Sequence, residues 1–338
     1  MNHELRTLNH EPSVYIGIDI GATEVKTGLV TRQGTLVSKE RHETAKIASP
    51  AHFLDILNET VHRLLQSNAL SKQSVGGIGI GAPGWVDYPH GIVRELTNIP
   101  GWRDVPIVIQ LQTATGLKSF VDNDANVMAV GELIHGAGRG HENFVCLTLG
   151  TGVGGAIVVD GKLYRGANGL AGEIGHMILD LNGPECACGA RGCLERYVGN
   201  RFIIANALRK LEALAGPVHE NILLSLADNR PDKITPKILA EAAARGDALS
   251  LDVWRETGHY LGVALSVLVN LLNPECFIIG GGVARAGSVL FDPMRDTAAR
   301  LAMNQLGKTT PIMEAELKED AGLIGAATFA LTCLEKAC

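Results

Sequence analysis

The sequence lacks any long hydrophobic stretch. Across its 338 residues no uninterrupted apolar run reaches the roughly 18 residues that a membrane-spanning helix needs. The polar opening MNHELRTLNHEP also lacks the apolar core of a signal peptide. These absences argue against an integral membrane protein and against a secreted one. The sequence therefore predicts a cytoplasmic protein that does not engage membranes.

Positive charge is scarce as well. Lys and Arg number 30 against 36 Asp and Glu, which gives a net charge of −6 at pH 7. A domain that binds nucleic acid or an anionic membrane surface normally presents a basic patch. The acidic balance makes nucleic acid a poor candidate partner.

Cysteines are few and unevenly spaced. Three of the seven fall within residues 186–193, and an odd, clustered set does not suit a disulfide framework. The candidate metal ligands are His176, Cys186, Cys188 and Cys193. One imidazole and three thiolates suit tetrahedral Zn²⁺ and leave no position for an activated water. The sequence therefore predicts a structural zinc knuckle over residues 176–193.

Glycine, in contrast, is abundant, and the chain is longer than one hydrophobic core usually supports. Its length favours two α/β lobes. The placement of motifs suggests a smaller lobe over residues 1–123 and a larger one over 124–320. The apolar C-terminal helix, 321–338, could complete the first lobe.

Two stretches share one pattern of a hydrophobic strand, a Gly and Thr turn and a returning strand. They are GIDIGATEVKTGLV at 17–30 and LTLGTGVGGAIVV at 147–159. This similarity indicates an internal duplication of one hairpin. Apolar periodicity predicts a helix over 51–66 and a largely helical region over 201–272, interrupted near 228–235.

Three glycine-rich loops could hold a nucleotide: DIGAT at 19–23, LGTGVGG at 149–155 and GGGV at 280–283. Glycine lets backbone N–H groups converge on phosphate oxygens because no Cβ stands in the way. None of the loops is a Walker loop, which disfavours a P-loop NTPase. The alternative is that the glycines merely close tight hairpins. The candidate nucleotide-binding residues are Asp19, Gly21, Ala22, Thr23, Lys26, Gly150, Thr151, Gly152, Gly154, Gly281, Gly282 and Val283.

Asp19 stands at the end of a buried strand, where a carboxylate is costly unless it holds a cation or hydrogen bonds. Two interpretations are open: coordination of Mg²⁺, directly or through water, or capping of the turn. Magnesium is favoured because phosphoryl transfer needs a divalent ion to neutralise the phosphates.

Together these motifs give the chain a resemblance to the ROK family of repressors and sugar kinases, and within it to bacterial ATP-dependent glucokinases. The matching segments are IGIDIGAT, NDAN at 123–126, LGTGVGGAIV, and GLAGEIGHM leading to CACGARGCLE, all in family order. The resemblance implies an actin-like ATPase (ribonuclease H-like) fold, duplicated into two lobes with a cleft between them. It also implies ATP with Mg²⁺, a bound hexose, and a homodimer or a dimer of dimers.

The resemblance also implies residue roles. Asp124 would be the catalytic base, and the sugar contacts would come from Gly84, Asn98, Asn123, Asp124, Glu173, His176 and Glu195. His176 would bind zinc through its other ring nitrogen. A sugar hydroxyl is a poor nucleophile, so a carboxylate placed to accept its proton is the expected device. The alternatives are helix capping for Asp124 and solvated surface charge for the two glutamates.

The expected reaction is transfer of the ATP γ-phosphoryl group to the 6-hydroxyl of glucose. A kinase for N-acetylmannosamine, N-acetylglucosamine, fructose or allose is the closest alternative, since these motifs do not separate the sugars. A sugar-binding regulator that lacks catalysis is less favoured because Asp124 is present. A repressor is disfavoured because only about thirteen residues precede VYIGIDI, too few for a helix-turn-helix domain.

Overall fold

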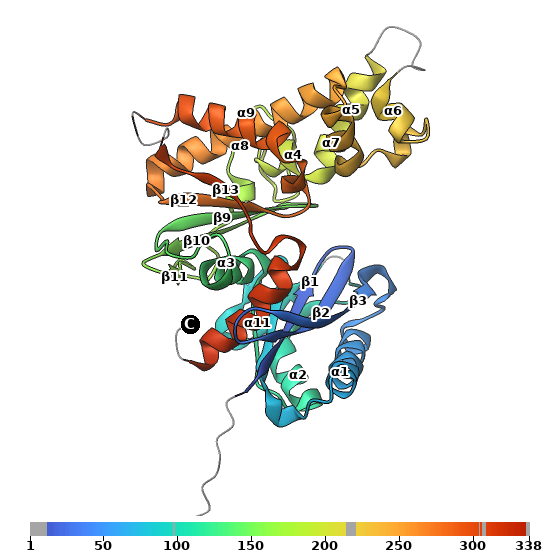
Figure 1. Ribbon diagram of the computed structural model, residues 1–338, viewed down its shortest axis with the longest axis vertical. Helices are drawn as coiled ribbons and strands as arrows, with labels where there is room; N and C mark the ends of the chain where they lie inside the picture. Colours follow the sequence, from blue (N-terminus) through green and yellow to red (C-terminus); the bar gives the residue numbers. More distant parts are fainter. Residues whose placement is uncertain (1–11, 97–98, 214–220, 304, 306–308, 336–338) are drawn as a thin grey trace, which may run out of the picture. The chain divides into compact units, whose positions relative to one another are not determined.

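The computed structural model describes residues 12–96, 99–213, 221–303, 305 and 309–335. Two units, each with its own hydrophobic core, make up this part of the chain (Figure 1). The first unit runs to His135 and resumes at Asp320, and the second runs from Gly136 to Glu319.

The division falls after His135 and not after Asn123, where the sequence placed it. Helix α3 (Asp124–His135) stays with the first unit because it packs closely against α11 (Ala321–Leu334). A Cβ at Gly325 would lie only 2.1 Å from the Val127 carbonyl oxygen, so the two helix backbones are in direct contact.

The sheet of the first unit has the order β3-β2-β1-β4-β8. Its strands are β1 (Val14–Ile20), β2 (Glu24–Thr31), β3 (Leu36–Glu43), β4 (Val75–Ala82) and β8 (Ser119–Asn123). β1 pairs antiparallel with β2, which confirms the predicted hairpin, and parallel with β4. β8 continues the sheet in parallel beyond β4.

Helices cover both faces of this sheet (Figure 1). α11 lies on β1 and β4 at very short range, because Cβ atoms at Gly17 and Gly79 would lie within 2.0 Å of α11 carbonyl oxygens. The other layer holds α1 (Pro50–Ser67), close to the predicted 51–66, and α2 (Ile107–Thr115). The small sheet β5 (Val86–Asp87), β6 (Ile92–Glu95) and β7 (Arg103–Val105) completes the unit.

The sheet of the second unit has the order β11-β10-β9-β12-β13 and repeats the first. Its strands are β9 (Phe144–Leu149), β10 (Val153–Val159), β11 (Lys162–Leu163), β12 (Cys276–Gly280) and β13 (Ile312–Glu314). In both sheets an antiparallel hairpin is followed by two strands parallel to its first strand. The duplication predicted from the two hairpins therefore extends to the whole sheet.

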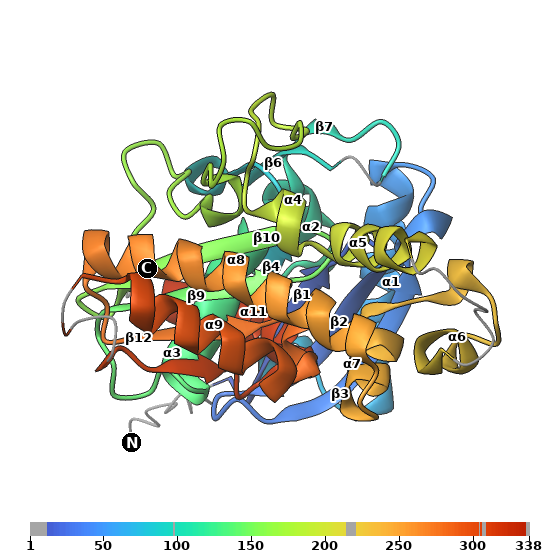
Figure 2. The ribbon, with the colours of Figure 1, turned by 90° about the horizontal axis from the view of Figure 1, so that it is seen from above.

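The helices of the second unit lie mainly between residues 195 and 301. They are α4 (Glu195–Val198), α5 (Asn200–Glu212), α6 (Ile222–Leu226), α7 (Pro236–Ala244), α8 (Ala248–Leu272) and α9 (Ser288–Leu301). The predicted break near 228–235 separates α6 from α7. α8 and α9 lie side by side over the sheet (Figures 1 and 2), with Gly258 and Gly262 of α8 against the α9 backbone.

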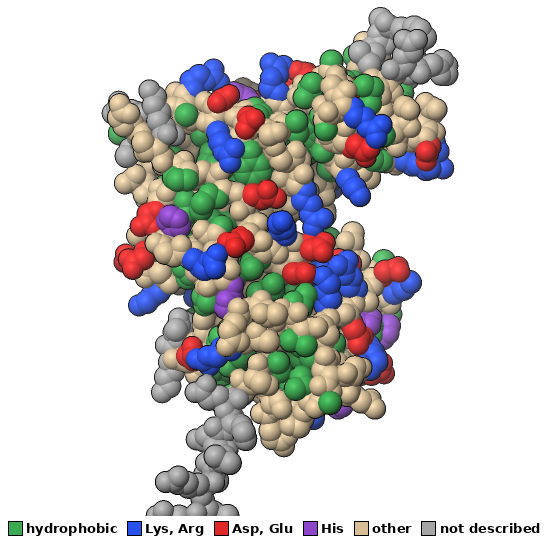
Figure 3. Space-filling model, in the orientation of Figure 1, with side chains coloured by type: hydrophobic (Ala, Val, Ile, Leu, Met, Phe, Trp, Pro, Cys, Tyr) green, Lys and Arg blue, Asp and Glu red, His purple; other side chains and the backbone are tan. Residues whose placement is uncertain are grey.

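Charges are mixed over the surface. On the face drawn in Figure 3, basic side chains lie among acidic ones in both units. None of the helices that the structure describes combines the length and the apolar character required to cross a membrane.

Candidate functional site

The first glycine loop is the tight turn between β1 and β2. The Gly21 N–H donates to the Glu24 carbonyl oxygen at 2.9 Å, and the Thr44 hydroxyl donates to the Gly21 carbonyl oxygen at 2.9 Å. A Cβ at Gly21 would lie 2.7 Å from the Glu24 oxygen, so the turn needs glycine. Ala22 and Thr23 are exposed at its tip, where their backbone is accessible to a ligand.

Asp19 precedes this turn and is largely buried. Its carboxylate lies 3.6 Å from the Lys26 ammonium, and a Cβ at Gly322 in α11 would come within 2.7–2.8 Å of its carboxyl atoms. Burial raises the pKa of the Asp19 carboxyl, and Lys26 offsets this only in part. An additional cation would stabilise the carboxylate, which fits the predicted magnesium role.

The second loop joins β9 to β10. The Gly150 N–H donates to the Gly152 carbonyl oxygen at 2.9 Å, and the Asn200 N–H donates to the Gly150 carbonyl oxygen at 2.9 Å. Thr151 is exposed at the tip. The loop is thus held in shape by itself and by the first residue of α5.

The third loop follows β12 and rests on the second. Gly281 has φ +87°, and a Cβ there would lie 2.3 Å from the Leu149 carbonyl oxygen. Gly282 has open space beside it. Val283 is fully buried in the core of the second unit and so anchors the end of this loop, which leaves Gly281 and Gly282 as its more exposed residues.

The NDAN segment forms the junction of β8 and α3. The Ala125 N–H donates to Oδ1 of Asn123 and to Oδ1 of Asp124, both at 2.9 Å. Asp124 therefore does contribute to the helix start, as the alternative interpretation held. The bond from Ala125 is made to Oδ1 and fixes the direction of the carboxylate.

Gly84 and Asn123, both expected on the sugar side, are joined directly. Asn123 Nδ2 donates to the Gly84 carbonyl oxygen at 3.2 Å, and Gly84 has φ +77°, a conformation that favours glycine. Asn98 lies outside the described residues.

Asp122 was missed by the sequence reasoning. Its side chain is 2% exposed, and Oδ1 accepts from the Asn123 N–H at 2.7 Å and from Asn126 Nδ2 at 2.8 Å. Like Asp19, it is a carboxylate at the end of a buried strand, and this position in the sequence is the signal that marks it. Asp122 holds the backbone from which Asn123 and Asp124 project.

His176, Cys186, Cys188 and Cys193 come together in the second unit, and their ligand atoms all lie within 4.8 Å of one another. His176 Nδ1 is 3.7 Å from Cys186 Sγ, and Cys188 Sγ is 3.7 Å from Cys193 Sγ. The loop closes through backbone bonds, including Cys186 N–H to the Ala190 carbonyl oxygen at 2.8 Å. Gly192 is required because a Cβ there would lie 1.7 Å from the Asp180 oxygen. These residues could hold a metal ion.

Two thiols of this cluster differ in acidity. A hydrogen bond from the Ala190 backbone and a second one with the Cys186 thiol lower the pKa of Cys188 to about 7. Burial raises the pKa of Cys193 to about 12, and the neighbouring sulfurs add to this. Cys188 is thus ready to bind a cation near neutral pH, whereas Cys193 loses its proton when a cation is present.

Glu173 and Glu195 lie on either side of the cluster in the sequence. The Glu173 side chain is exposed, and its carbonyl oxygen accepts from the His176 N–H at 3.0 Å. Glu195 begins α4, and its Oε2 accepts from the Val153 N–H at 3.0 Å. Glu195 is therefore a structured acceptor and not merely a solvated surface charge.

In each unit the candidate loops follow the carboxyl ends of neighbouring parallel strands. In the first, β1, β4 and β8 are parallel neighbours and end at Ile20, Ala82 and Asn123. In the second, β9 and β12 are parallel neighbours and end at Leu149 and Gly280. Ligands of open α/β sheets bind at such carboxyl ends.

Comparison with known proteins decides the family. A family model described as ROK family matches residues 15–333. The chain belongs to the ROK family.

Similar proteins of the ROK family include glucokinases. The glucokinase of Thermotoga maritima is 37% identical over 315 residues, covering 93% of this chain and 96% of that protein. The glucokinase of Streptomyces coelicolor is 36% identical over 316 residues, covering 93% and 96%. A solved ROK family glucokinase from Streptomyces griseus, in complex with glucose and AMPPNP, is 35% identical with a TM-score of 0.83, covering 94% of this chain and 99% of that chain. These similarities confirm the actin-like ATPase fold.

Proposed function

We propose that this ROK protein is an ATP-dependent glucokinase that transfers the γ-phosphoryl group to the 6-hydroxyl of glucose. The observation that carries the proposal is the β8–α3 junction, where hydrogen bonds fix a carboxylate beside an amide at the carboxyl edge of the sheet. The ROK glucokinases similar to it along almost the whole chain support the choice of sugar.

Asp124 acts as the general base. Its Oδ1 is held by the Ala125 N–H, so the carboxylate is oriented before the substrate arrives. It accepts the proton of the hexose hydroxyl as that oxygen attacks the γ-phosphorus, and ADP leaves. Asn123, fixed through Gly84, contacts the same sugar.

The remaining hexose hydroxyls are held by Glu173, His176 and Glu195. Carboxylates and an imidazole nitrogen accept hydrogen bonds from vicinal hydroxyls. In His176 the Nδ1 atom faces Cys186, so Nε2, on the other side of the ring, is directed elsewhere and serves the sugar.

Backbone N–H groups of the loops at 21–23 and 150–154 hold the phosphates of ATP. Gly281 and Gly282 lie by the adenosine, in the loop that Val283 anchors in the core. Lys26 adds positive charge next to Asp19. Asp19 would hold Mg²⁺, directly or through water. Bound there, the ion would neutralise charge on the transferred phosphoryl group.

The four-ligand cluster fits structural zinc. Four ligands at about 2.3 Å from a shared tetrahedral centre lie about 3.7 Å apart. The two pairs at 3.7 Å match this spacing. The ion would fix the loop from which His176 and Glu195 project, and so shape the sugar-binding wall.

A coupled assay of ADP release with ATP, Mg²⁺ and a panel of hexoses tests the proposal. We expect turnover with glucose and a fall in kcat of about 10²–10⁴-fold in Asp124→Ala. Asp55→Ala, an exposed carboxylate on α1, is the matched control and should retain parental activity. Turnover with an N-acetylated sugar alone would overturn the substrate, and none with any sugar would overturn the kinase.

We also infer a homodimer or a dimer of dimers in the cytoplasm. Exposed apolar side chains lie at the end of α8 (Val267 and Leu271), on the last residue of α9 (Leu301) and just after it (Met303). A surface of this kind favours association. The Met303 N–H donates to Asn270 Oδ1 at 2.8 Å, which joins the two segments. The clustered thiols and the use of ATP suit a reducing compartment. Light scattering after size-exclusion chromatography tests the assembly.

A further inference from the structure

One hydrogen bond links the proposed sugar site to the proposed phosphate loop within the second unit. Glu195 Oε2 accepts from the Val153 N–H at 3.0 Å. Val153 is the first residue of β10, directly after the loop of Gly150, Thr151 and Gly152. A residue expected to hold sugar therefore also holds the exit of the loop expected to hold phosphate.

Gly152 makes this contact possible. A Cβ at Gly152 would lie 2.5 Å from Glu195 Oε2, so the carboxylate would have to shift to admit it. Gly152 has no positive φ, so its requirement is one of space and not of backbone conformation. Gly150, two residues earlier, has open space where a Cβ would be added.

The loop also rests on the segment that follows Glu195. The Asn200 N–H donates to the Gly150 carbonyl oxygen at 2.9 Å. A Cβ at Gly199 would lie 3.0 Å from the Glu195 carbonyl oxygen and 3.1 Å from that of Thr151. Residues 150–153 thus lie along residues 195–200.

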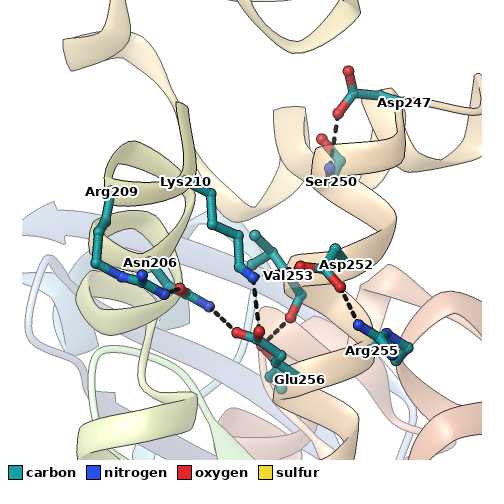
Figure 4. A network of polar contacts seen from close by, with 10 residues as sticks. Asn206, Arg209, Lys210, Asp247, Ser250, Asp252, Val253, Arg255 and Glu256 are labelled. Carbon is teal, nitrogen blue, oxygen red and sulfur yellow. Dashed lines mark hydrogen bonds and ion pairs between the residues drawn. The ribbon is translucent and has the colours of Figure 1, made fainter. Parts of the chain in front are cut away.

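This supporting segment is fixed at both ends. Before it, the Leu194 N–H donates to the Met177 carbonyl oxygen at 2.9 Å, which ties it to the cysteine cluster. After it, α5 is clamped to α8, because Lys210 lies between the carboxylates of Asp252 and Glu256 (Figure 4). The segment that carries Glu195 is therefore anchored on both sides of the contact with the loop.

We propose that Glu195 couples glucose binding to nucleotide binding through the Val153 N–H, and that Gly152 is a positioning residue for this contact. The inference rests on the proposed glucokinase function. Oε2 holds the loop while Oε1 accepts from a sugar hydroxyl, so each ligand favours the carboxylate position that the other needs. By linkage, the factor by which nucleotide tightens glucose binding equals the factor by which glucose tightens nucleotide binding.

Calorimetric titration of glucose, with and without saturating Mg²⁺ and a non-hydrolysable ATP analogue, measures this factor. In the parent protein we expect nucleotide to tighten glucose binding at least about fivefold. In Gly152→Ala the added methyl group displaces Oε2 from Val153, and the factor should fall close to one. In Lys237→Met, a change at an exposed side chain of α7 outside both proposed binding sites, the factor should stay at the parental value.

A second pair of variants covers the case in which Gly152→Ala does not fold. Glu195→Gln keeps an oxygen that accepts from Val153, so it should weaken glucose binding with and without nucleotide but retain coupling. Glu195→Ala removes the acceptor and should lose both affinity and coupling.

An uncoupled parent that still phosphorylates glucose would overturn this inference and leave the proposed function intact. Parental coupling in Gly152→Ala or Glu195→Ala, or its loss in Lys237→Met, would also overturn it. Failure of the parent to turn over glucose would instead count against the function.

Discussion

At the residue scale, two carboxylates at strand ends in the first unit show how burial is compensated in different ways. Oδ1 of Asp122 accepts hydrogen bonds from the Asn123 N–H and from Asn126 Nδ2. Asp19 has Lys26 at 3.6 Å, and burial still raises its pKa. Asp122 is therefore suited to stabilise the β8–α3 junction. The charge of Asp19 is only partly compensated by Lys26, so a divalent cation would stabilise it further.

Asp19→Asn should stabilise the protein without ligands while abolishing most of its activity. A raised pKa means that the folded state binds the proton more tightly than the unfolded state. The free-energy cost of folding with a charged Asp19 carboxylate is therefore absent below pH 3.8, the usual pKa of the group. This cost grows as pH rises through the pKa of Asp19 in the folded state, and it is complete above that pKa. At pH 7 the variant should melt higher, by about 2–4 °C for each kcal/mol relieved.

Calorimetric melting of both proteins from pH 3 to pH 8 measures this difference. The gap in melting temperature should close toward acid. A variant that melts lower than the parent at pH 7 in the absence of Mg²⁺ would contradict the assignment.

Asp122→Ala should impair the position of Asp124. The change leaves the buried Asn126 amide without this acceptor, which costs about 1–3 kcal/mol of folding free energy. Because the β8–α3 junction loosens, kcat should fall while KM for ATP stays near the parental value. Denaturant unfolding and steady-state kinetics measure the two effects. Asp55→Ala should change neither, and parental kcat in Asp122→Ala would show that the junction does not depend on this carboxylate.

At the scale of elements, the second unit is organised around the pairing of α5 with α8. Lys210 donates to Glu256 at 2.7 Å and also to Asp252, and Asn206 Nδ2 donates to Glu256 at 2.8 Å (Figure 4). Burial disfavours the charge of Lys210, but the two carboxylates outweigh this and raise its pKa. The side chain of Lys210 is only 18% exposed, so the contact is screened less than a surface ion pair.

Lys210→Met should lower the free energy of unfolding by about 1 kcal/mol near pH 7, because the aliphatic packing is kept and the ionic contact is lost. Hydrogen bonds from Lys210 and Arg255 lower the pKa of Asp252 below 3.8. The part of the effect due to Asp252 is therefore present above pH 3.8 and is lost as pH falls through its folded pKa. Urea unfolding at pH 7 and below pH 3 checks both statements. Lys237→Met, at an exposed lysine of α7, serves as control. An equal loss of unfolding free energy in this control would show that the contact of Lys210 with the two carboxylates does not cause the effect.

At the scale of the whole molecule, each of the two hydrophobic cores contains a buried tryptophan. Trp102 is buried in the first, and Trp254 is fully buried in the second. The cysteine cluster belongs to the second unit alone. Loss of its metal should therefore act first on the second unit.

Removal of zinc by a strong chelator should raise hydrogen exchange in residues 172–200 most of all, and in the rest of the second unit more than in residues 12–135. The reason is that three thiols and an imidazole lose the ion that holds their loop. Metal analysis should give one zinc per chain in the parent and in Cys276→Ala, and much less in Cys188→Ser. Full zinc content in Cys188→Ser would contradict the ligand set.

The sequence by itself determined the features that depend on neighbouring residues. It predicted both hairpins, the helix at 51–66, the glycine loops, the ligand set of the cysteine cluster and the family, because turn chemistry, periodicity and ligand spacing are local. It placed the lobe boundary at Asn123 because nothing local shows that α3 packs on α11, nearly two hundred residues away.

Only the tertiary structure decided which residues act on one another across the chain. Asp122 became part of the candidate site through Asn126 and the Asn123 backbone. Val283 lost its place as a direct contact because the whole residue is buried. The Glu195–Val153 contact joins residues 42 positions apart, and Gly152 owes its necessity to the Glu195 oxygen and not to its own turn. Such contacts are set by the packing of whole elements, so no local pattern in the sequence records them.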